Sequence, residues 1–210
     1  MSDLFWEAYE YLQQGGWIMI PLGLASLAMW ALIADRLLSF RAYTTGDIGT
    51  GDALRILAGG EAGAVPDSGG LRRELLAAVL AERSGDAELD RNILHQHAIA
   101  LRPRIRQHLQ IIAVLASVAP LLGLLGTVLG MIETFEVIAL FGTGNAKAMA
   151  GGISVALVTT QAGLLVAVPG LLVSAALVRR ARRLEIGFDE FTQLLDRALK
   201  NRTRALVARA

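Results

Sequence analysis

Three stretches of the sequence that contain no Asp, Glu, Lys or Arg constrain its fold most strongly. They cover residues 11–34, 107–132 and 148–178. About 20 mostly apolar residues are enough for a helix to cross the hydrocarbon core of a bilayer, so each stretch is long enough to span a membrane. The chain is 54% hydrophobic and 19% charged, whereas about a quarter of the residues in soluble domains are charged. The sequence therefore predicts an all-α, polytopic membrane protein with three transmembrane helices.

The basic residues predict the direction of these spans. Lys147 is the only Lys or Arg between the second and third stretches, whereas RRARR (179–183) follows the third and three arginines lie within 102–106, just before the second. Lys and Arg close to span ends concentrate on the cytoplasmic side of a membrane. We therefore expect an outside amino terminus and a cytoplasmic carboxyl terminus. An aromatic belt would then mark the outer interface, formed by Trp6, Tyr9, Tyr11 and Trp17.

These signals divide the chain into seven predicted segments. They are an outer amino-terminal segment (1–14), a first span (15–38), a cytoplasmic helical loop (39–106), a second span (107–140), an outer hairpin (141–147), a third span (148–178) and a cytoplasmic carboxyl-terminal helix (179–210). We expect long helices to extend from the spans into a helical cytoplasmic domain.

The predicted cytoplasmic segments contain local helix signals. Residues 71–85 have apolar positions at helical spacing and end at a glycine. Asp86 can cap a helix over 87–101, which should bend or restart near Pro103, and residues 58–70 indicate a flexible linker. In the tail, five apolar residues form one helical stripe that needs a partner in the same chain or in a neighbouring copy: Leu184, Phe188, Phe191, Leu195 and Leu199.

The composition argues against several classes of function. With no cysteine, the sequence excludes disulfides, thiolate metal sites and cysteine nucleophiles. His95, His97 and His108 lack metal-ligand spacing, and no nucleophile–base pattern suggests an enzyme. A net charge of +1 argues against nucleic-acid binding. We therefore expect no cofactor, no metal and no enzymatic activity, and the acidic, aromatic start predicts no cleavable signal peptide.

Small residues recur along one face of the second span and one face of the third. The third-span face is Gly152, Ala156, Thr160, Gly163, Ala167, Gly170 and Ser174; the second-span face is Ala116, Pro120, Gly123, Thr127 and Gly130, with Gly126 opening a GxxxG match. Lipid provides little hydrophobic drive for helix association, so membrane helices join by close packing on such residues. We expect both faces to be helix-packing surfaces.

The threonines on these faces allow two interpretations. Each hydroxyl can bond a carbonyl of its own helix, or Thr127 and Thr160 can face a shared polar path. Thr159 points about 100° away from Thr160, so we expect it to face another helix or subunit. We expect Gln161 to be a further packing contact.

Two acidic residues lie near the outer end of the second span. Glu133 and Glu136 share one helical face, and they either mark the outer interface or form an outer mouth that attracts protons or cations. No Asp, Glu, Lys or Arg lies deep within a span, although a proton path across a membrane needs a titratable group. If the chain forms an ion path, a partner must contribute that group.

Several motifs together resemble the MotA/TolQ/ExbB proton-channel family, and its ExbB/TolQ branch in particular. They are APLLGLLGTVLGMIETF (119–135), GGISVALVTTQAGLLVAVPGLL (151–172), GGWIMIPL (15–22) and the Asp35–Arg36 pair. The resemblance covers nearly the whole chain. By motif position, Thr127 and Thr160 match the family's pore-facing threonines, and Pro120 and Pro169 match its helix prolines.

The resemblance implies a function and an assembly. Proteins of this branch form a homo-oligomeric ring, usually of five copies, in the bacterial inner membrane. The ring surrounds single-span ExbD/TolR-like helices that carry an intramembrane aspartate. Proton flow then powers a TonB- or TolA-like protein for outer-membrane transport or integrity.

One position departs from the family pattern, and other functions stay open. The best-known ExbB pattern has a glutamate five residues before the second threonine, where this chain has Val155. The alternatives are a non-conducting membrane scaffold, a stator of another motility or export system, and an autonomous small-solute channel.

Overall fold

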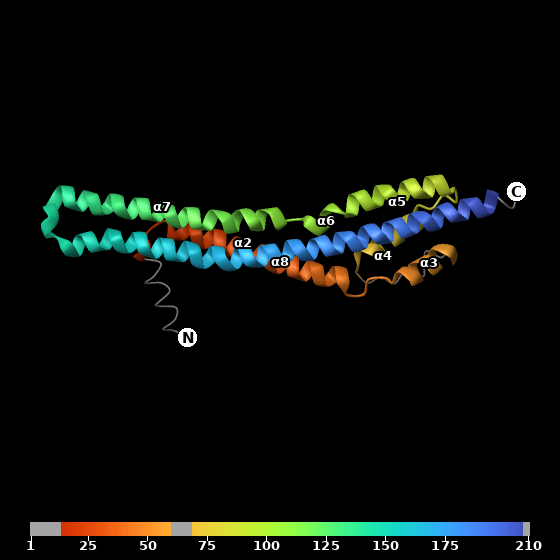
Figure 1. The fold of residues 1–210 in the computed structure, drawn as a ribbon, viewed down its shortest axis with the longest axis horizontal. Helices are drawn as coiled ribbons and strands as arrows, with labels where there is room; N and C mark the ends of the chain where they lie inside the picture. Colours follow the sequence, from red (N-terminus) through yellow and green to blue (C-terminus); the bar gives the residue numbers. More distant parts are fainter. Residues whose placement is uncertain (1–13, 60–68, 208–210) are drawn as a thin grey trace. The chain divides into compact units, whose positions relative to one another are not determined.

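The computed structural model describes residues 14–59 and 69–207, and every regular element in these ranges is helical (Figure 1). The elements are α2 (Met19–Thr44), α3 (Thr50–Gly59), α4 (Leu71–Ala81), α5 (Ala87–Leu101), α6 (Pro103–Arg106), α7 (Leu109–Phe141), the short 3₁₀ helix η2 (Gly142–Gly144) and α8 (Ala146–Val207). The predicted all-α class is confirmed. Three of the predicted belt residues, Trp6, Tyr9 and Tyr11, and most of the predicted linker lie outside the described ranges.

Three of the described helical stretches are long and apolar enough to cross a membrane. They contain α2, α7 and α8, and only 22–28% of the most apolar 18-residue part of each stretch is buried within the chain. Apolar side chains that face outward over such lengths are what a helix in lipid requires. Trp17, the one described belt residue, is likewise 64% exposed. The three predicted spans are thus matched by three suitable helices.

The chain divides into two compact units. The first comprises Met1–Ala34 and His108–Ala176, and the second comprises Asp35–Gln107 and Leu177–Ala210. The division falls within α2 and within α8, which each contain residues of both units, and at the turn between α6 and α7.

In the first unit, α7 and the beginning of α8 form an antiparallel hairpin (Figure 1). Gly142 adopts φ 70°, which suits a glycine because it has no Cβ. After η2, the Asn145 side chain accepts a hydrogen bond from the backbone N–H of Ala148 at 3.1 Å and so begins α8. The α2 helix packs on this hairpin through a cluster that includes Met19 and Leu22.

In the second unit, the predicted Asp86 cap and the break near Pro103 are confirmed, and the predicted end of the preceding helix differs. Asp86 caps α5 by accepting the N–H of Glu88 at 2.8 Å, and the helix restarts at Pro103 as α6. The helix predicted over 71–85 ends at Ala81 instead of Gly85. The reason is that buried Asp90 accepts both the backbone N–H and the hydroxyl of Ser84, which holds this segment in a turn.

The apolar stripe of the tail packs within its own chain. Four of its five residues are at most 2% exposed and Leu184 is half-buried: Phe188, Phe191, Leu195 and Leu199 form the buried part. The guanidinium of Arg72 on α4 lies 5.6 Å from the centre of the Phe191 ring. Of the two partners that the sequence left open, the structure shows the same chain.

Ion pairs join α5 and α6 to the same segment of α8. Arg91 donates to Asp196 at 2.7 Å, Arg102 pairs with Asp189 at 3.0 Å, and Arg106 donates to Glu185 at 2.7 Å. As the arginine number rises, the number of its acidic partner falls, so the pairs fix an antiparallel register. The buried apolar stripe holds the helices together and the pairs set their alignment; Arg102–Asp189, which is exposed on both sides, adds little stability.

Arg36 is the most buried arginine of the described residues, with 4% of its surface exposed. It pairs with Asp35 at 3.0 Å and donates to the carbonyl of Arg104 at 3.2 Å. The Asp35–Arg36 pair noted in the sequence therefore joins the end of the apolar part of α2 to α6. A buried charge requires such partners.

Candidate functional site

The helices α7 and α8 touch backbone to backbone. A Cβ atom added to Gly123 would lie 2.9 Å from the carbonyl oxygen of Thr159, and one added to Gly163 would lie 2.8 Å from that of Ala119. No side chain fits at such distances. Six of the eight predicted packing positions are buried and the two prolines are half-buried: the buried six are Gly123, Gly126, Gly130, Ala156, Gly163 and Ala167, and the others are Pro120 and Pro169.

Thr159 occupies the centre of this contact. Its side chain is 0% exposed and faces Gly126. Its hydroxyl donates to the carbonyl of Val155 at 2.8 Å. The sequence placed Thr160 on the small-residue face, whereas the structure has Thr159 buried there and leaves Thr160 half-buried; the other residues of that face are buried as expected. Thr159 and Thr160 follow Ala156 by three and four residues, and both spacings return to roughly the same side of a helix. The structure selects Thr159, because its side chain fills the space beside Gly126.

Thr127 and Thr160 lie on one side of the hairpin. Each follows a residue of the Gly126–Thr159 contact by one position, and one step along a helix turns a side chain by about 100°. Because α7 and α8 are antiparallel, this step turns both side chains toward the same side of the pair. The two threonines therefore emerge on a common side, at the level of that contact.

The α2 helix covers the opposite side. Leu122 and Ala162 pack on the cluster that α2 forms with the hairpin. Around their own helix axes, both side chains point roughly 40–60° away from the direction of the Gly126–Thr159 contact. This rotation is opposite in sense to that of Thr127 and Thr160. On the threonine side, the apolar neighbours are largely exposed: Leu124, Met131, Leu157 and Leu164. Within the described ranges, the chain leaves this side of the hairpin uncovered.

Both threonine hydroxyls bond their own helices. Thr127 donates to the carbonyl of Leu124 at 2.6 Å, and Thr160 donates to that of Ala156 at 2.9 Å. Both side chains are half-buried, and the structure shows no hydrogen bond between them. A hydroxyl that donates one hydrogen bond still has lone pairs to accept others. The observed bonds thus leave two acceptor oxygens on the uncovered side. Gln161, which the sequence suggested as a packing contact, is exposed within the single chain.

The two acidic residues lie elsewhere. Glu133 and Glu136 are exposed, and Glu133 lines an open concavity of about 410 Å³ together with Gln14, Ser154 and Val155. Since Val155 is close to Gly16, which precedes α2, this concavity lies on the α2 side of the hairpin. Within one chain, the structure brings Glu133 to Val155 and not to the threonines.

Sequence reasoning missed Thr134. It is 5% exposed, donates to the carbonyl of Gly130 at 2.8 Å, and lies against Gly152. Its spacing of four from Gly130 on the small-residue face could have identified it.

The histidines do not assemble a metal site. His95 bonds Asp196 at 3.2 Å, and His97 lies 3.1 Å from Glu82. Across residues 14–59 and 69–207, no three His, Asp or Glu side chains are grouped to hold a metal ion.

Comparison with known proteins places this hairpin in a defined family. The family model described as the MotA/TolQ/ExbB proton channel family matches residues 68–190, which is more than half of the chain. The chain is 44% identical to the biopolymer transport protein ExbB of Aquifex aeolicus over 82 residues, 39% of this chain and 55% of that protein. It is 34% identical to the Tol-Pal system protein TolQ of Haemophilus influenzae over 90 residues, 41% of this chain and 40% of that protein.

Another similarity extends over most of the sequence. The chain is 33% identical over 171 residues to the putative biopolymer transport protein ExbB-like 3 of Synechocystis, which covers 75% of this chain and 79% of that protein. By contrast, it spans about half the length of the Aquifex protein and 31% of the exbB1 protein of Vibrio cholerae. Together with the three membrane-length helices, these similarities show that the chain belongs to the MotA/TolQ/ExbB proton channel family.

Proposed function

We propose that this chain is an ExbB/TolQ-like subunit of a complex that uses the proton-motive force. Several copies, with five as the expected number, form a ring around ExbD/TolR-like single-span helices. The complex powers a TonB- or TolA-like protein for outer-membrane transport or integrity. Family membership and the names of the ExbB and TolQ relatives support this proposal.

The uncovered side of the hairpin carries the proposal. It presents Thr127 and Thr160 at one level within an otherwise apolar surface. In a ring, this side of each copy faces the enclosed helices, and the threonine oxygens accept hydrogen bonds from water along the path. A non-conducting scaffold needs the small-residue contact but gives no role to two acceptors outside it.

A partner supplies the titratable group. The three charge-free stretches contain no Asp, Glu, Lys or Arg, and proton transfer across a membrane needs such a group. An aspartate on an enclosed partner helix, level with the threonines, meets this need. Each proton that crosses a potential of 100 mV releases about 2.3 kcal/mol, so several transfers can drive one mechanical step.

Glu133 and Glu136 are the proposed outer mouth. Glu133 shares its concavity with Val155, which stands where the best-known ExbB pattern has a glutamate. A carboxylate on α7 can therefore attract protons close to the position where the α8 carboxylate is absent. This role concerns proton entry and is separate from the threonine pair.

The proposed orientation follows the basic residues. The amino terminus and the η2 hairpin face the periplasm, and the carboxyl-terminal part of α8 is in the cytoplasm. The five residues Arg179–Arg183 include four arginines directly after the third span, and such residues stay on the cytoplasmic side.

The test is proton uptake by liposomes that contain the full chain and its single-span partner, read with a pH-sensitive dye under an applied potential. Thr127→Val and Thr160→Val each remove an acceptor oxygen of the proposed path and keep the side-chain shape. We expect each to lower the proton flux about tenfold or more, which corresponds to a barrier that is higher by about 1.4 kcal/mol. Thr159→Val is the matched control because its hydroxyl faces α7.

The outcomes separate the candidate functions. A flux that needs the partner and the Thr160 hydroxyl, but not that of Thr159, agrees with the proposal. If Thr127→Val and Thr160→Val conduct like the unmodified complex, the threonine path is wrong. Flux through the chain without any partner would instead indicate an autonomous channel.

A further inference from the structure

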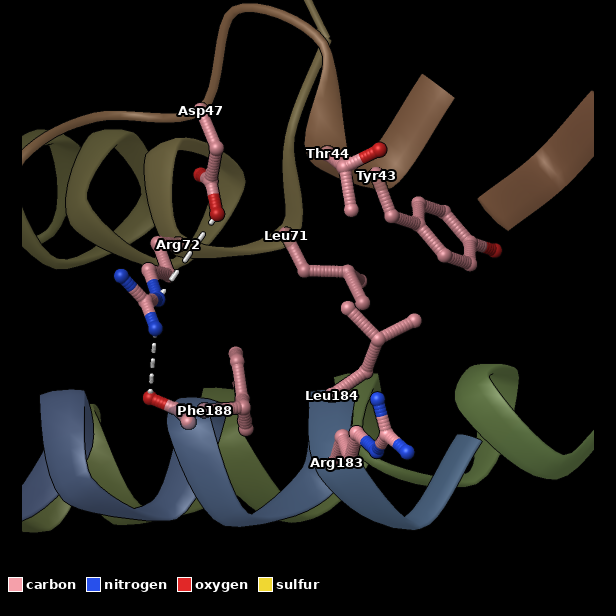
Figure 2. A pocket seen from close by; sticks show the side chains of 9 residues that line it. Tyr43, Thr44, Asp47, Leu71, Arg72, Arg183, Leu184 and Phe188 are labelled. Atoms are coloured by element: carbon pink, nitrogen blue, oxygen red, sulfur yellow. Dashed lines mark hydrogen bonds and ion pairs between the residues drawn. The ribbon is translucent and has the colours of Figure 1, made fainter. Parts of the chain in front are cut away.

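The second unit contains a pocket of about 250 Å³ that the proton path does not use. The end of α2, the segment that follows it, the start of α4 and one face of α8 line the pocket. Figure 2 shows Leu71 and Leu184 pointing toward each other, between Asp47 and Arg72 on one side and Tyr43 and Arg183 on the other. Phe188 adds to the apolar lining. The pocket therefore combines an apolar floor with charged and hydroxyl groups.

One side of the pocket is fully occupied by internal interactions. Arg72 donates to the carbonyl of Gly187 at 3.0 Å and lies 3.7 Å from the carboxylate of Asp47 (Figure 2). Asp47 also accepts the backbone N–H of Ile48 at 3.1 Å. These groups satisfy one another, so they give this side of the pocket a fixed shape.

The other side presents polar groups without internal partners. The guanidinium of Arg183 and the hydroxyl of Tyr43 make no hydrogen bond or ion pair with any residue in the described part of the chain. Arg183 is exposed and Tyr43 is half-buried. A guanidinium and a phenol hydroxyl are both donors, so together they suit a ligand rich in acceptor oxygens, such as a phosphate.

The position of Arg183 along α8 indicates the source of this phosphate. It follows Val178, the last residue of the third charge-free stretch, by five residues. At 1.5 Å per residue this is about 7 Å along the helix, and the headgroup layer on each side of a bilayer is about 5–7 Å deep. Measured from Val178, Arg183 thus lies about as far along α8 as the headgroup layer is deep, and apolar Leu184 lines the same pocket.

We propose that this pocket binds the phosphate headgroup of an anionic phospholipid from the cytoplasmic leaflet. Arg183 pairs with the phosphate, Tyr43 donates to it, and Leu71, Leu184 and Phe188 contact the glycerol and the first acyl carbons. The exposed arginines 179, 180 and 182 raise the local lipid concentration, and the pocket provides the selection. The proposal does not rest on the threonine path.

The test uses the full chain in an uncharged detergent, with phosphatidylglycerol and phosphatidylcholine as probes and native mass spectrometry to count the lipids retained. Arg183→Gln removes the charge at the pocket, and Arg182→Gln is its control on the same helix, with the same loss of charge outside the pocket. Thr44 at the end of α2 also lines the pocket (Figure 2), so Thr44→Trp fills it without changing any charge. Circular dichroism checks that each variant keeps its helix content.

We expect the unmodified chain to retain phosphatidylglycerol in preference to phosphatidylcholine. Arg183→Gln should lower the phosphatidylglycerol affinity about tenfold or more, because it removes a charge-assisted hydrogen bond to the phosphate. Thr44→Trp should abolish the preference, whereas Arg182→Gln should change it less than about twofold because that residue contributes only to the general field.

Three results would overturn the proposal. They are equal losses in Arg182→Gln and Arg183→Gln, an unchanged preference in Thr44→Trp, and displacement of the lipid by glycerol 3-phosphate at equal concentration, which would identify a soluble phosphate ester as the ligand. The Thr160→Val variant should retain the lipid normally, so this test and the proton-flux test can fail separately.

Discussion

The same helix, α8, packs in two different ways along its length. In the first unit, its glycines, alanines and Thr159 let the backbone of α7 approach directly. In the second unit, Phe188, Phe191 and Leu195 fill the space to its neighbours, and ion pairs set the register. Lipid does not drive apolar side chains together, whereas water does. Backbone contact therefore replaces hydrophobic burial where α8 enters the membrane.

The largest expected effect comes from removing a ring in the second unit. Phe191 is 1% exposed and has Arg72 over its ring. Phe191→Ala should destabilise this unit by about 3–5 kcal/mol, because the cavity cannot fully collapse. Hydrogen exchange read by mass spectrometry should show lost protection in α4 and α5. If protection in the α7–α8 hairpin falls equally, the stability of the first unit depends on the packing of Phe191 and the two units are not independent.

The second effect comes from adding a methyl group in the first unit. Gly126→Ala places a Cβ against the Thr159 side chain, and overpacking of this kind costs about 1–3 kcal/mol. Protection should fall in the hairpin and persist in α4 and α5.

The reciprocal change is the control for this substitution. Adding Thr159→Gly to Gly126→Ala empties the space that the new methyl group enters, so the double variant should recover most of the lost protection. A double variant that is no better than Gly126→Ala would show that Thr159 does not fill the gap at Gly126.

The smallest expected effect concerns the ion pairs of the second unit. The hydrogen bond from Arg91 holds the pKa of Asp196 below its ordinary range, and His95 acts in the same direction. A carboxyl with a depressed pKa stabilises the fold above its unfolded pKa, near 3.9, and this contribution is lost as the pH falls through the folded pKa. Asp196→Asn should therefore lower the melting temperature slightly at pH 7 and flatten its fall below about pH 4.

Asp52→Asn is the matched control for that titration. Asp52 pairs with Arg55 at 3.9 Å, and both side chains are largely exposed. Its substitution should leave the melting curve unchanged at every pH. If Asp196→Asn behaves in the same way, the ion pairs do not contribute to the alignment of α5 on α8.

Local signals in the sequence were sufficient for much of the fold. The charge-free stretches, the Asp86 cap and the break at Pro103 each depend on a few adjacent residues, and the structure confirms them. The choice between Thr159 and Thr160 depends on the position of Gly126, more than 30 residues away. Periodicity alone could not make that choice, because both threonines lie close to the small-residue face.

The lipid pocket could not be predicted for a similar reason. Asp47, Arg72 and Gly187 come from three separate segments that meet only in the folded chain. The partner of the tail stripe was open as well, because an apolar stripe does not specify which surface covers it. The threonine path and the acidic outer mouth stay predictions that need the assembled complex.

Cysteine labelling can measure which of the three threonine positions water reaches, because the chain has no cysteine of its own. Thr127→Cys, Thr159→Cys and Thr160→Cys would each be made singly and reconstituted with the single-span partner. A small, water-soluble methanethiosulfonate reagent would then be added. We expect Cys at positions 127 and 160 to react through the water of the path, whereas Cys at position 159 stays buried against Gly126 and does not react. Equal reaction at 159 and 160, or none at 127 and 160, would contradict this expectation.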